Sequence, residues 1–290
     1  MSRASIAWGL LLLAAIPAGH LRAAESYDNC VGTIETLPAT IGSQGVWCLK
    51  ADKSTAISSG AAITIAVPNV TLDCNGFKLG GLAAGAGTYT IGIYAGDKAN
   101  ITIRNCSVRG FHTGAQLVGS SGHLVEDNRF DSNTVVGVAV TADNYVIRNN
   151  MITQTGLSTI ASTAHGILAA GSAAVIDDNL VSGVAGNFNL YSFALGAGVQ
   201  VSAHQSVLRN NHVTGIYSAT DTTVYGIGSA GADNKLLDNT VGGLNSPTGT
   251  RRGLDCTGDT SAVAVRNVIS SASPAYEVYA CTDGGGNVIH

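Results

Sequence analysis

The feature that most constrains the fold of this chain is a short segment that occurs eight times along it. One copy reads Asn100-Ile-Thr-Ile-Arg-Asn-Cys-Ser-Val108, and another reads Tyr145-Val-Ile-Arg-Asn-Asn-Met-Ile152. In the aligned copies one position recurs at similar intervals, at Asn75, Cys106, Asn128, Asn150, Asn179, Asn211, Asn239 and Asn267. An apolar position recurs just after it, at Phe77, Val108, Phe130, Ile152, Val181, Val213, Val241 and Ile269. A period of a few tens of residues indicates a repeat architecture in which each unit stacks on the next.

A second marker in each unit is a glycine followed by alternating apolar residues. It occurs at Gly92, Gly114, Gly137, Gly166, Gly198, Gly226 and Gly253. The segment from this glycine to the next asparagine position has nearly the same length in every unit, whereas the segment from an asparagine position to the next glycine varies widely. All insertions therefore fall in the same turn of each unit, and in solenoids such insertions line one face, often the binding face.

Three short segments with period-two alternation in each repeat predict a parallel β-helix. Leucine-rich repeats lack this combination of Asn and Gly, and propeller blades have about twice the period. Parallel coils place each position above itself, so the Asn side chains can bond to one another, and Asn also tolerates the left-handed backbone of a tight turn. We expect an all-β, single-stranded, right-handed parallel β-helix (a solenoid) of about eight coils with an N-terminal cap.

A column of charged residues lies two positions before the asparagine column. Its sign alternates at every step, through Asp73, Arg104, Glu126, Arg148, Asp177 and Arg209. Unlike charges on neighbouring strands contribute roughly 0.2–1 kcal/mol per pair, and a slip of register would oppose like charges. We interpret this column as a structural device that fixes register, so its members are not counted as catalytic candidates.

The N-terminal residues differ from the rest of the chain. Arg3, an apolar run from Ile6 to Ile16 and small residues up to Ala24 predict a secretory signal peptide over residues 1–24. Residues 25–58 do not follow the repeat and are interpreted as the cap, and residues 59–290 are the predicted β-helix domain. No later segment is long and apolar enough to span a membrane. The mature protein is therefore expected to be secreted or periplasmic.

Charge and cysteine content narrow the class further. The formal net charge of −4 lacks the basic footprint of a nucleic-acid binder, and the low charged fraction of 12% excludes a disordered chain. Cysteines in an exported chain indicate disulfide bonds. Proximity in the sequence favours the pairs Cys30 with Cys48, Cys74 with Cys106, and Cys256 with Cys281. The second pair is one position out of register, which a turn can accommodate but a regular strand cannot. The alternative for Cys106 is a buried free thiol.

The repeat also predicts a face on which a ligand can bind. The residue in the middle of the strand after the marker glycine should point outward, beside the variable turn; these residues are Tyr94, Gln116, Ala139, Leu168, Gln200, Gly228, Asp255 and Tyr279. The five longest insertions span Gly80–Thr90, Thr153–His165, Ser182–Leu195, Thr214–Tyr225 and Gly242–Arg252. Aromatic rings stack on the C–H faces of sugars, and amides bond to sugar hydroxyls. The candidate substrate-binding residues are Tyr94, Gln116, Gln200, Tyr191, Tyr217, Tyr225 and Arg251. The alternative for the loop aromatics is burial under their own loops.

The charged group on this predicted face is Asp255, which is flanked by Arg251, Arg252 and Asp259, with Tyr279 one coil further. An Arg pair suits a uronate carboxylate, and Asp255 or Tyr279 could move the proton in a lyase or glycosidase reaction. The candidate catalytic residues are therefore Asp255, Arg252 and Tyr279, and the alternative is a solvated, charge-rich loop. The histidines are too scattered for a metal site, and no cofactor is indicated.

Several of these motifs together resemble a known family. Asn69-Val-Thr-Leu-Asp-Cys-Asn-Gly76, the strands that end in Asn and the Gly-Ile/Val-x-Val strands are similar to the pectate-lyase-like, right-handed parallel β-helix proteins, over about residues 60–290. The resemblance implies a secreted lyase, hydrolase or epimerase of acidic polysaccharides, or a binding or adhesive protein. The family's catalytic motifs do not transfer. Asp177-Asp178 lies in structural columns, Ala164-His165-Gly166 precedes it rather than follows it, and no Arg-x-Lys motif or calcium-binding carboxylate cluster is found.

We therefore expect a polysaccharide-directed β-helix protein that acts as a polysaccharide lyase or glycosidase in a groove lined by the variable turns. The competing expectation is a non-catalytic carbohydrate-binding, adhesive or structural surface protein. The expected partner is a polysaccharide or glycan, and neither nucleic acid nor a membrane span is expected after signal removal.

Overall fold

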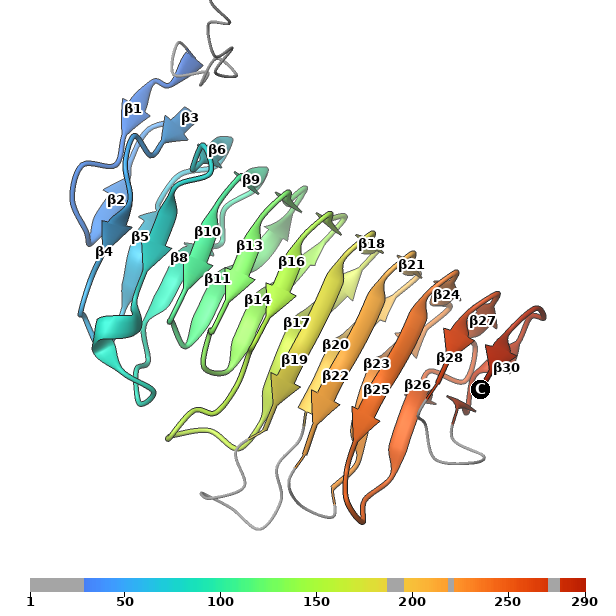
Figure 1. Ribbon diagram of the computed structural model, residues 1–290. Helices are drawn as coiled ribbons and strands as arrows, with labels where there is room; N and C mark the ends of the chain where they lie inside the picture. The colour runs from blue at the N-terminus through green and yellow to red at the C-terminus, as the bar shows by residue number, and fades with distance from the viewer. Residues whose placement is uncertain (1–28, 187–195, 219–221, 271–276) are drawn as a thin grey trace, which may run out of the picture.

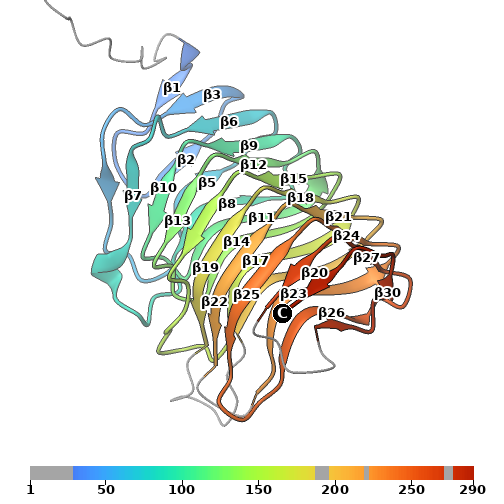
Figure 2. The same ribbon diagram turned by 45° about the vertical axis from the view of Figure 1, so that its right-hand side comes forward.

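The computed structural model describes residues 29–186, 196–218, 222–270 and 277–290. These residues form three parallel β-sheets, and each coil passes through sheet A, sheet C and sheet B in turn. Neighbouring coils stack along a rod (Figure 1), and the sheets form its three walls (Figure 2). A short 3₁₀ helix, η2 (Leu82–Ala84), follows one of the early strands of sheet C. The predicted all-β solenoid of about eight coils is confirmed.

The strands of each sheet are short and follow one another at the period of the repeat. Sheet A contains β1 (Gly32–Thr33), β3 (Gly45–Cys48), β6 (Val70–Asp73), β9 (Ile101–Arg104), β12 (Leu124–Glu126), β15 (Val146–Arg148), β18 (Val175–Asp177), β21 (Val207–Arg209), β24 (Lys235–Leu237), β27 (Val263–Val265) and β30 (Thr282–Asp283). Sheet C contains β4 (Lys53–Ser54), β7 (Lys78–Gly80), β10 (Ser107–Arg109), β13 (Arg129–Asp131), β16 (Met151–Thr153), β19 (Leu180–Ala185), β22 (His212–Tyr217), β25 (Thr240–Asn245), β28 (Val268–Ile269) and β31 (Val288–Ile289). Sheet B contains β2 (Ala39–Ile41), β5 (Ala61–Ile65), β8 (Ile91–Gly96), β11 (Thr113–Ser121), β14 (Val136–Asp143), β17 (Ala164–Ser172), β20 (Gly196–His204), β23 (Val224–Ala232), β26 (Arg251–Gly258) and β29 (Val278–Tyr279).

The first four strands lie before the regular repeat but join the same three sheets. β1 pairs with β3, β2 with β5, and β4 with β7, all in parallel. These strands therefore extend the walls of the rod at its N-terminal end. The domain boundary at residue 58 stays a prediction, and the predicted signal peptide lies outside the described residues.

The apolar column predicted from the repeat forms the inward face of sheet C, with one correction. Val108 pairs with Leu79 and not with Phe77. The reason is that the connection between sheets A and C is longer after β6, where it runs from Cys74 to Phe77, than after β9, where it consists of Asn105 and Cys106. From Leu79 onward the column is fully buried: Leu79, Val108, Phe130, Ile152, Val181, Val213, Val241 and Ile269. Burial of such side chains, at roughly 1.5–3 kcal/mol each, is the main force that holds the coils together.

The corner between sheets A and C is the most regular part of the molecule. From β9 to β28 this corner is always a pair of residues, and we call it the asparagine corner: residues 105–106, 127–128, 149–150, 178–179, 210–211, 238–239 and 266–267. The second residue of each pair is the predicted column, and its side chain is buried. Asn150, for example, donates from Nδ2 to Asn179 Oδ1 at 3.0 Å and to the Val125 carbonyl at 2.9 Å. The ladder continues one coil beyond the prediction, because Asn267 donates to Asn287.

Two tasks that the sequence assigned to one asparagine are divided between neighbours. The left-handed residue is the first of each pair, such as Asp127 (φ 55°) or Asn149 (φ 54°), while the second residue makes the ladder. In the first coil Asn75 itself takes the left-handed position (φ 50°), so the ladder does not include it. At Cys106 the backbone N–H still donates to Asn128 Oδ1, and the side chain is joined to Cys74.

Charges and disulfides also follow the predicted register. The column from Asp73 to Arg209 is aligned on sheet A, and its ion pairs measure 2.8, 2.6 and 2.7 Å. All three predicted disulfides are present: Cys30–Cys48, Cys74–Cys106 and Cys256–Cys281. The alternative of a free thiol at Cys106 is wrong.

The corner between sheets C and B is as irregular as the asparagine corner is regular. We call it the variable corner: the connections from each strand of sheet C to the next strand of sheet B, between β7 and β29. The connection from β10 to β11 is the short segment between Arg109 and Thr113, whereas those after β7 and β16 are several times longer. The connections after β7 and β16 project from the same edge of the rod (Figure 1). The predicted insertions are too long at their starts, because Ser182, Thr214 and Gly242 lie inside strands β19, β22 and β25.

Just after the variable corner, the second or third residue of each sheet B strand from β8 to β26 is a marker glycine, where neighbouring coils pack too tightly for a side chain. A Cβ added at Gly198 would lie 2.7 Å from the carbonyl oxygen of Gly226 and would also meet the Val213 side chain. Gly137 and Gly166 face the carbonyl of the next marker glycine in the same way. The chain can therefore vary before this point but must return to one fixed position.

Candidate functional site

The predicted alignment of the outward column on sheet B is confirmed. Its members pair on successive strands: Tyr94, Gln116, Ala139, Leu168, Gln200, Gly228, Asp255 and Tyr279. Parallel strands lie about 4.8 Å apart, so the column runs along most of the rod. Its chemistry changes along this length, since the middle is apolar and the C-terminal end carries an amide, a carboxylate and a phenol.

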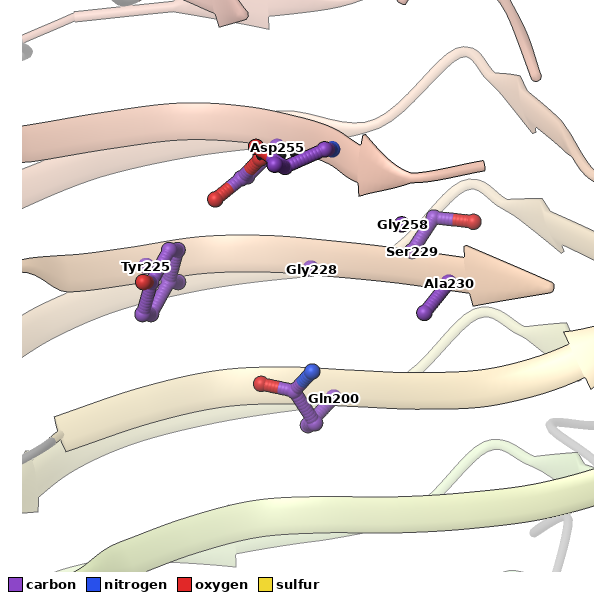
Figure 3. Close-up of a pocket in the computed structure, with 8 residues that line it drawn as sticks. Gln200, Tyr225, Gly228, Ser229, Ala230, Asp255 and Gly258 are labelled. Atoms are coloured by element: carbon purple, nitrogen blue, oxygen red, sulfur yellow. Dashed lines mark hydrogen bonds between the residues drawn. The ribbon is translucent and has the colours of Figure 1, made fainter. Parts of the chain in front are cut away.

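A hollow of about 300 Å³ opens in this column at Gly228. Because Gly228 has no side chain, Gln200 and Asp255 face each other across it from the neighbouring strands (Figure 3). Tyr225, from the beginning of β23, and Thr257, from β26, complete the walls. The two polar side chains are two strand spacings apart, about 10 Å along the rod. This spacing leaves room for a group of the size of one sugar ring.

A β-bulge lies beside the hollow. Gly228 pairs with Asp255 and Ala230 with Gly258, so β26 carries one more residue than β23 between these pairs. Bulges redirect side chains and are common next to active sites. Here the bulge turns Thr257 back toward Asp255, whose Oδ1 accepts hydrogen bonds from both the backbone N–H and the hydroxyl of Thr257. The Cys256–Cys281 disulfide ties the bulged strand to the next coil.

Arg252 lies between the carboxylate and two aromatic rings. Its Nη1 donates to Asp255 Oδ2 at 2.7 Å and to the Thr257 hydroxyl at 3.2 Å. The guanidinium carbon lies 4.1 Å from the centroid of the Tyr279 ring and 5.8 Å from that of Tyr225, both within the range of cation–π attraction. Burial lowers the pKa of Arg252, but the hydrogen bond and charge of Asp255 outweigh burial and hold the pKa above its ordinary value.

These contacts determine which groups in the hollow accept hydrogen bonds and which donate them. Asp255 is only 6% exposed and accepts three hydrogen bonds, one of them from a cation. Burial and then the charge of Asp255 raise the pKa of Tyr225, so its phenol is a donor and not a base at neutral pH. The arrangement presents a fixed acceptor, a neutral phenol and an amide to whatever enters the hollow.

The structure brings some of the predicted residues together and separates others. Arg251 pairs with Val224, one position before Arg252, and is partly buried outside the hollow. Tyr217 lies at the end of β22 on sheet C and is 39% exposed. Tyr94 and Gln116 belong to the same outward column as Asp255 but lie six and five strands away. Tyr191 lies outside the described residues.

Three residues of the hollow and its support were not among the predicted site residues, although the sequence placed Gly228 in the outward column and Asp259 near Asp255. Thr257 was not expected because the bulge that redirects it leaves no sequence signal. Gly228 has no side chain, whereas its neighbours in the outward column, Gln200 and Asp255, do. This difference was the feature of the sequence from which the hollow could have been predicted. Beneath the wall, the fully buried Asp259 accepts hydrogen bonds from Asn234 Nδ2 at 2.7 Å and from the Ser261 hydroxyl at 3.0 Å. This buried network supports the end of β23.

No group of three or more His, Cys, Asp or Glu side chains in the described ranges is placed to hold a metal ion. In that same part of the chain, helices long and apolar enough to cross a bilayer are absent.

The family is shown by comparison with known proteins. Residues 44–241, more than half of the chain, match the family model described as "Right handed beta helix region". The chain therefore belongs to the right-handed β-helix proteins, with a pectate-lyase-like fold. No curated protein matched the sequence.

Solved structures agree with this fold at low sequence identity. The Dettilon tailspike protein has a TM-score of 0.57 and 14% identity, with 89% of this chain and 60% of the tailspike covered. The mannuronan C-5 epimerase AlgE4 A-module of Azotobacter vinelandii has a TM-score of 0.50 and 15% identity, with 89% and 85% covered. The DFA-IIIase of Arthrobacter chlorophenolicus A6 in complex with GF2 has a TM-score of 0.50 and 10% identity, with 83% and 69% covered. The chain thus spans about three fifths of the tailspike.

Proposed function

We propose that this protein binds a carbohydrate and that the hollow around Gly228 is a subsite for one sugar unit. The observation that carries the proposal is the pairing of Gln200 and Asp255 across Gly228, with the Tyr225 ring beside them. Sugars present hydroxyl groups on their rims and C–H groups on their faces. An amide and a carboxylate bond to the former, and an aromatic ring packs on the latter.

The position of the hollow supports a chain-like ligand. It lies in a straight column on an open wall of the rod, next to the variable corner, where solenoids often bind their ligands. The fold neighbours include an epimerase named for mannuronan, which supports a carbohydrate ligand at the level of fold. Export is part of the proposal, because three disulfides are typical of proteins that fold in an oxidising compartment.

Within this proposal, carbohydrate binding without catalysis is favoured over cleavage of the carbohydrate. A glycosidase needs two carboxylates about 5–10 Å apart, and among the described residues that line the hollow the carboxylate is Asp255. That carboxylate is held by Arg252 and Thr257 and is poorly placed to exchange a proton. A lyase needs a base, and the raised pKa of Tyr225 opposes that role. Lyase or glycosidase activity through Asp255, Arg252 and Tyr279 is the second candidate.

The test of binding is a titration of short oligosaccharides into the protein, selected from a panel of acidic and neutral glycans by retention. Gln200→Ala and Tyr225→Ala should each weaken binding about tenfold, which corresponds to about 1.4 kcal/mol. Gln116→Ala is the matched control, because Gln116 is the same residue type in the same outward column, outside the hollow. It should change the affinity less than about twofold. Equal losses in Gln200→Ala and Gln116→Ala would contradict a subsite at Gly228.

The test of catalysis uses the same panel. New reducing ends would reveal hydrolysis, and absorbance of unsaturated uronates would reveal a lyase. We expect neither with the glycans that bind. Turnover that disappears in Asp255→Asn while binding persists would instead establish the second candidate.

A further inference from the structure

A second cluster of charged residues lies on a different wall of the rod. On the strands of sheet C from β10 to β28 the charged side chains are Arg109, Arg129 and Asp131. Arg109 pairs directly with Asp131 across neighbouring strands, and Arg129 lies two residues before Asp131 on the same face. This cluster therefore has two cations and one anion, on a chain whose formal net charge is −4.

The ion pairs of this cluster are looser than those on sheet A. Arg109 Nη2 lies 3.5 Å from Asp131 Oδ2, and Arg129 Nη2 lies 3.8 Å from Asp131 Oδ1. The pairs on sheet A measure 2.8, 2.6 and 2.7 Å, close to the roughly 2.7–2.9 Å of a charge-assisted hydrogen bond. Asp131 Oδ1 instead accepts a hydrogen bond from the Thr153 hydroxyl at 2.8 Å. One carboxylate is shared by two guanidinium groups that it does not saturate.

The guanidinium of Arg109 has a further unused donor. Its Nε is buried and has no hydrogen-bond partner among the described residues. Arginine has five N–H donors in a planar fork that matches two oxygens of a carboxylate or sulfate. The buried Nε is not itself open to a ligand. The excess positive charge and the Nη donors that Asp131 does not saturate are the chemistry that recognises an oxyanion.

The cluster opens on a hollow that is larger than the one on sheet B. Its volume is about 590 Å³, and it is lined by Arg109, Arg129, Asp131, Thr153, Gln154, Ser182 and Gly183. A carboxylate alone would fill a small part of this space, which lies within the range of about 300–1,000 Å³ typical of ligand sites. The remaining wall offers two hydroxyls and an amide, which are partners for the hydroxyl groups of a sugar.

We propose that Arg109 and Arg129 form a second binding site, on sheet C, for the carboxylate of an acidic sugar. The sugar carboxylate takes the donors that Asp131 leaves unused, and its hydroxyls bond to Thr153, Gln154 and Ser182. This site is separate from the hollow at Gly228, because it lies on another wall and shares no residue with it. The assignment of this second site does not rest on the function proposed for the hollow at Gly228.

The test is a set of titrations with D-galacturonate, D-galactose and acetate, followed by ligand-observed NMR. We expect galacturonate to bind at least about tenfold more tightly than either of the others, equivalent to about 1.4 kcal/mol. The reason is that the site requires both the anion and the hydroxyl groups. Equal affinity for galacturonate and acetate, or for galacturonate and galactose, would overturn the assignment.

Three variants locate the binding. Arg109→Gln combined with Arg129→Gln should weaken galacturonate binding more than about tenfold, and Arg209→Gln, a comparably exposed arginine in a tight pair on sheet A, should change it less than about twofold. Asp131→Asn should strengthen binding severalfold, because it removes the carboxylate that competes with the ligand. A gain of affinity cannot result from misfolding and would support the proposal. Unchanged or weaker binding in an Asp131→Asn protein that keeps the wild-type melting temperature would overturn it.

The same titration in Gln200→Ala separates this proposal from the preceding one. Galacturonate binding should persist in Gln200→Ala, whose changed residue lies in the sheet B hollow. Loss of binding there would show that galacturonate occupies the hollow at Gly228 and would overturn a site on sheet C.

Discussion

The asparagine corner and the variable corner turn the same chain through the same rod, but they do so by opposite means. The asparagine corner keeps one length in coil after coil, and its side chains bond to one another in a buried line. The variable corner changes length from one coil to the next. Both corners must satisfy the backbone groups that a turn leaves without sheet partners. The first does so with one repeated side chain, whereas the second, whose length changes, cannot use one repeated position in every coil.

The difference shows where the molecule has freedom to acquire a ligand site. An insertion at the asparagine corner would interrupt the bonds between successive Asn side chains, because each amide bonds to the coils on both sides. An insertion at the variable corner leaves the next strand in place, because the marker glycine resets the register. Both proposed sites lie beside the variable corner: Tyr225 follows it on sheet B, and Gln154 and Gly183 lie at or near its start on sheet C. The asparagine corner thus keeps the register constant, and the proposed ligand sites lie beside the other corner, where the residues vary.

The largest effect is expected at the asparagine corner. Asn179→Ala removes the acceptor of the Asn150 backbone N–H and the donor to the Ile147 carbonyl, both buried. Each orphaned group costs about 1–3 kcal/mol, so we expect a loss of about 3–5 kcal/mol in the free energy of unfolding. Chemical denaturation monitored by circular dichroism measures it.

The matched control lies next to the variable corner. Asn245 ends β25 and is exposed, so Asn245→Ala should change the free energy of unfolding by less than about 0.5 kcal/mol. Similar losses in the two variants would show that the corners do not differ in the way their contacts suggest.

The second effect tests the point where the variable corner returns to fixed register. Gly198→Ala places a methyl group against the Gly226 carbonyl oxygen and the Val213 side chain, and the backbone atom cannot move without shifting the next coil. We expect a loss of about 2–3 kcal/mol from overpacking. Gly42→Ala is the control, because an added Cβ there would meet no atom within 4 Å. If Gly198→Ala leaves the melting temperature unchanged, the spacing between coils can adjust to the added methyl group. The marker glycine would then not be what fixes the register after the variable corner.

The regular corner is also the part that could be predicted from the sequence. Stacked coils turn a three-dimensional contact into a one-dimensional alignment, so the charge column, the outward column from Tyr94 to Tyr279 and the ladder from Asn128 to Asn267 could be predicted from the repeat. The disulfides were predicted from proximity in the sequence, with a free thiol left open at Cys106. The prediction failed where a coil departs from the common length. The longer connection after Asp73 moved Leu79 into the place expected for Phe77. The bulge in β26 brought Thr257 beside Asp255.

The candidate sites were predicted only in part, for a related reason. The register gives the position of Arg252 or Arg109 on a wall but not the geometry of its guanidinium. Arg252 is held at 2.7 Å by one carboxylate, whereas Arg109 and Arg129 lie 3.5 and 3.8 Å from a shared one. In the sequence all three are arginines near an aspartate. Whether such a pair is saturated depends on side-chain packing, which no spacing of residues contains.

The smallest expected effect is a dependence of stability on pH that arises beside the variable corner and not at the asparagine corner. His165 enters β17 directly after a variable corner, and burial lowers its pKa from 6.5 to about 4. In the unfolded chain the imidazole binds a proton near pH 6.5, so between about pH 6.5 and 4 the unfolded state holds more protons. Stability is therefore complete above about pH 7 and falls by about 2 kcal/mol by pH 5. The asparagine side chains of the other corner do not titrate in this range.

Denaturation midpoints between pH 5 and 8 measure this effect in the wild-type protein and in His165→Gln. The variant should lose less stability than the wild type below about pH 6.5, because the uncharged amide has no proton to bind. Part of the profile remains, since burial also lowers the pKa of His112 and of His123. His204→Gln is the matched control, since His204 is exposed on β20 of the same sheet, and its profile should follow that of the wild type. If His165→Gln retains the full acid sensitivity, His165 is not the group whose protonation destabilises the fold, and the prediction is wrong.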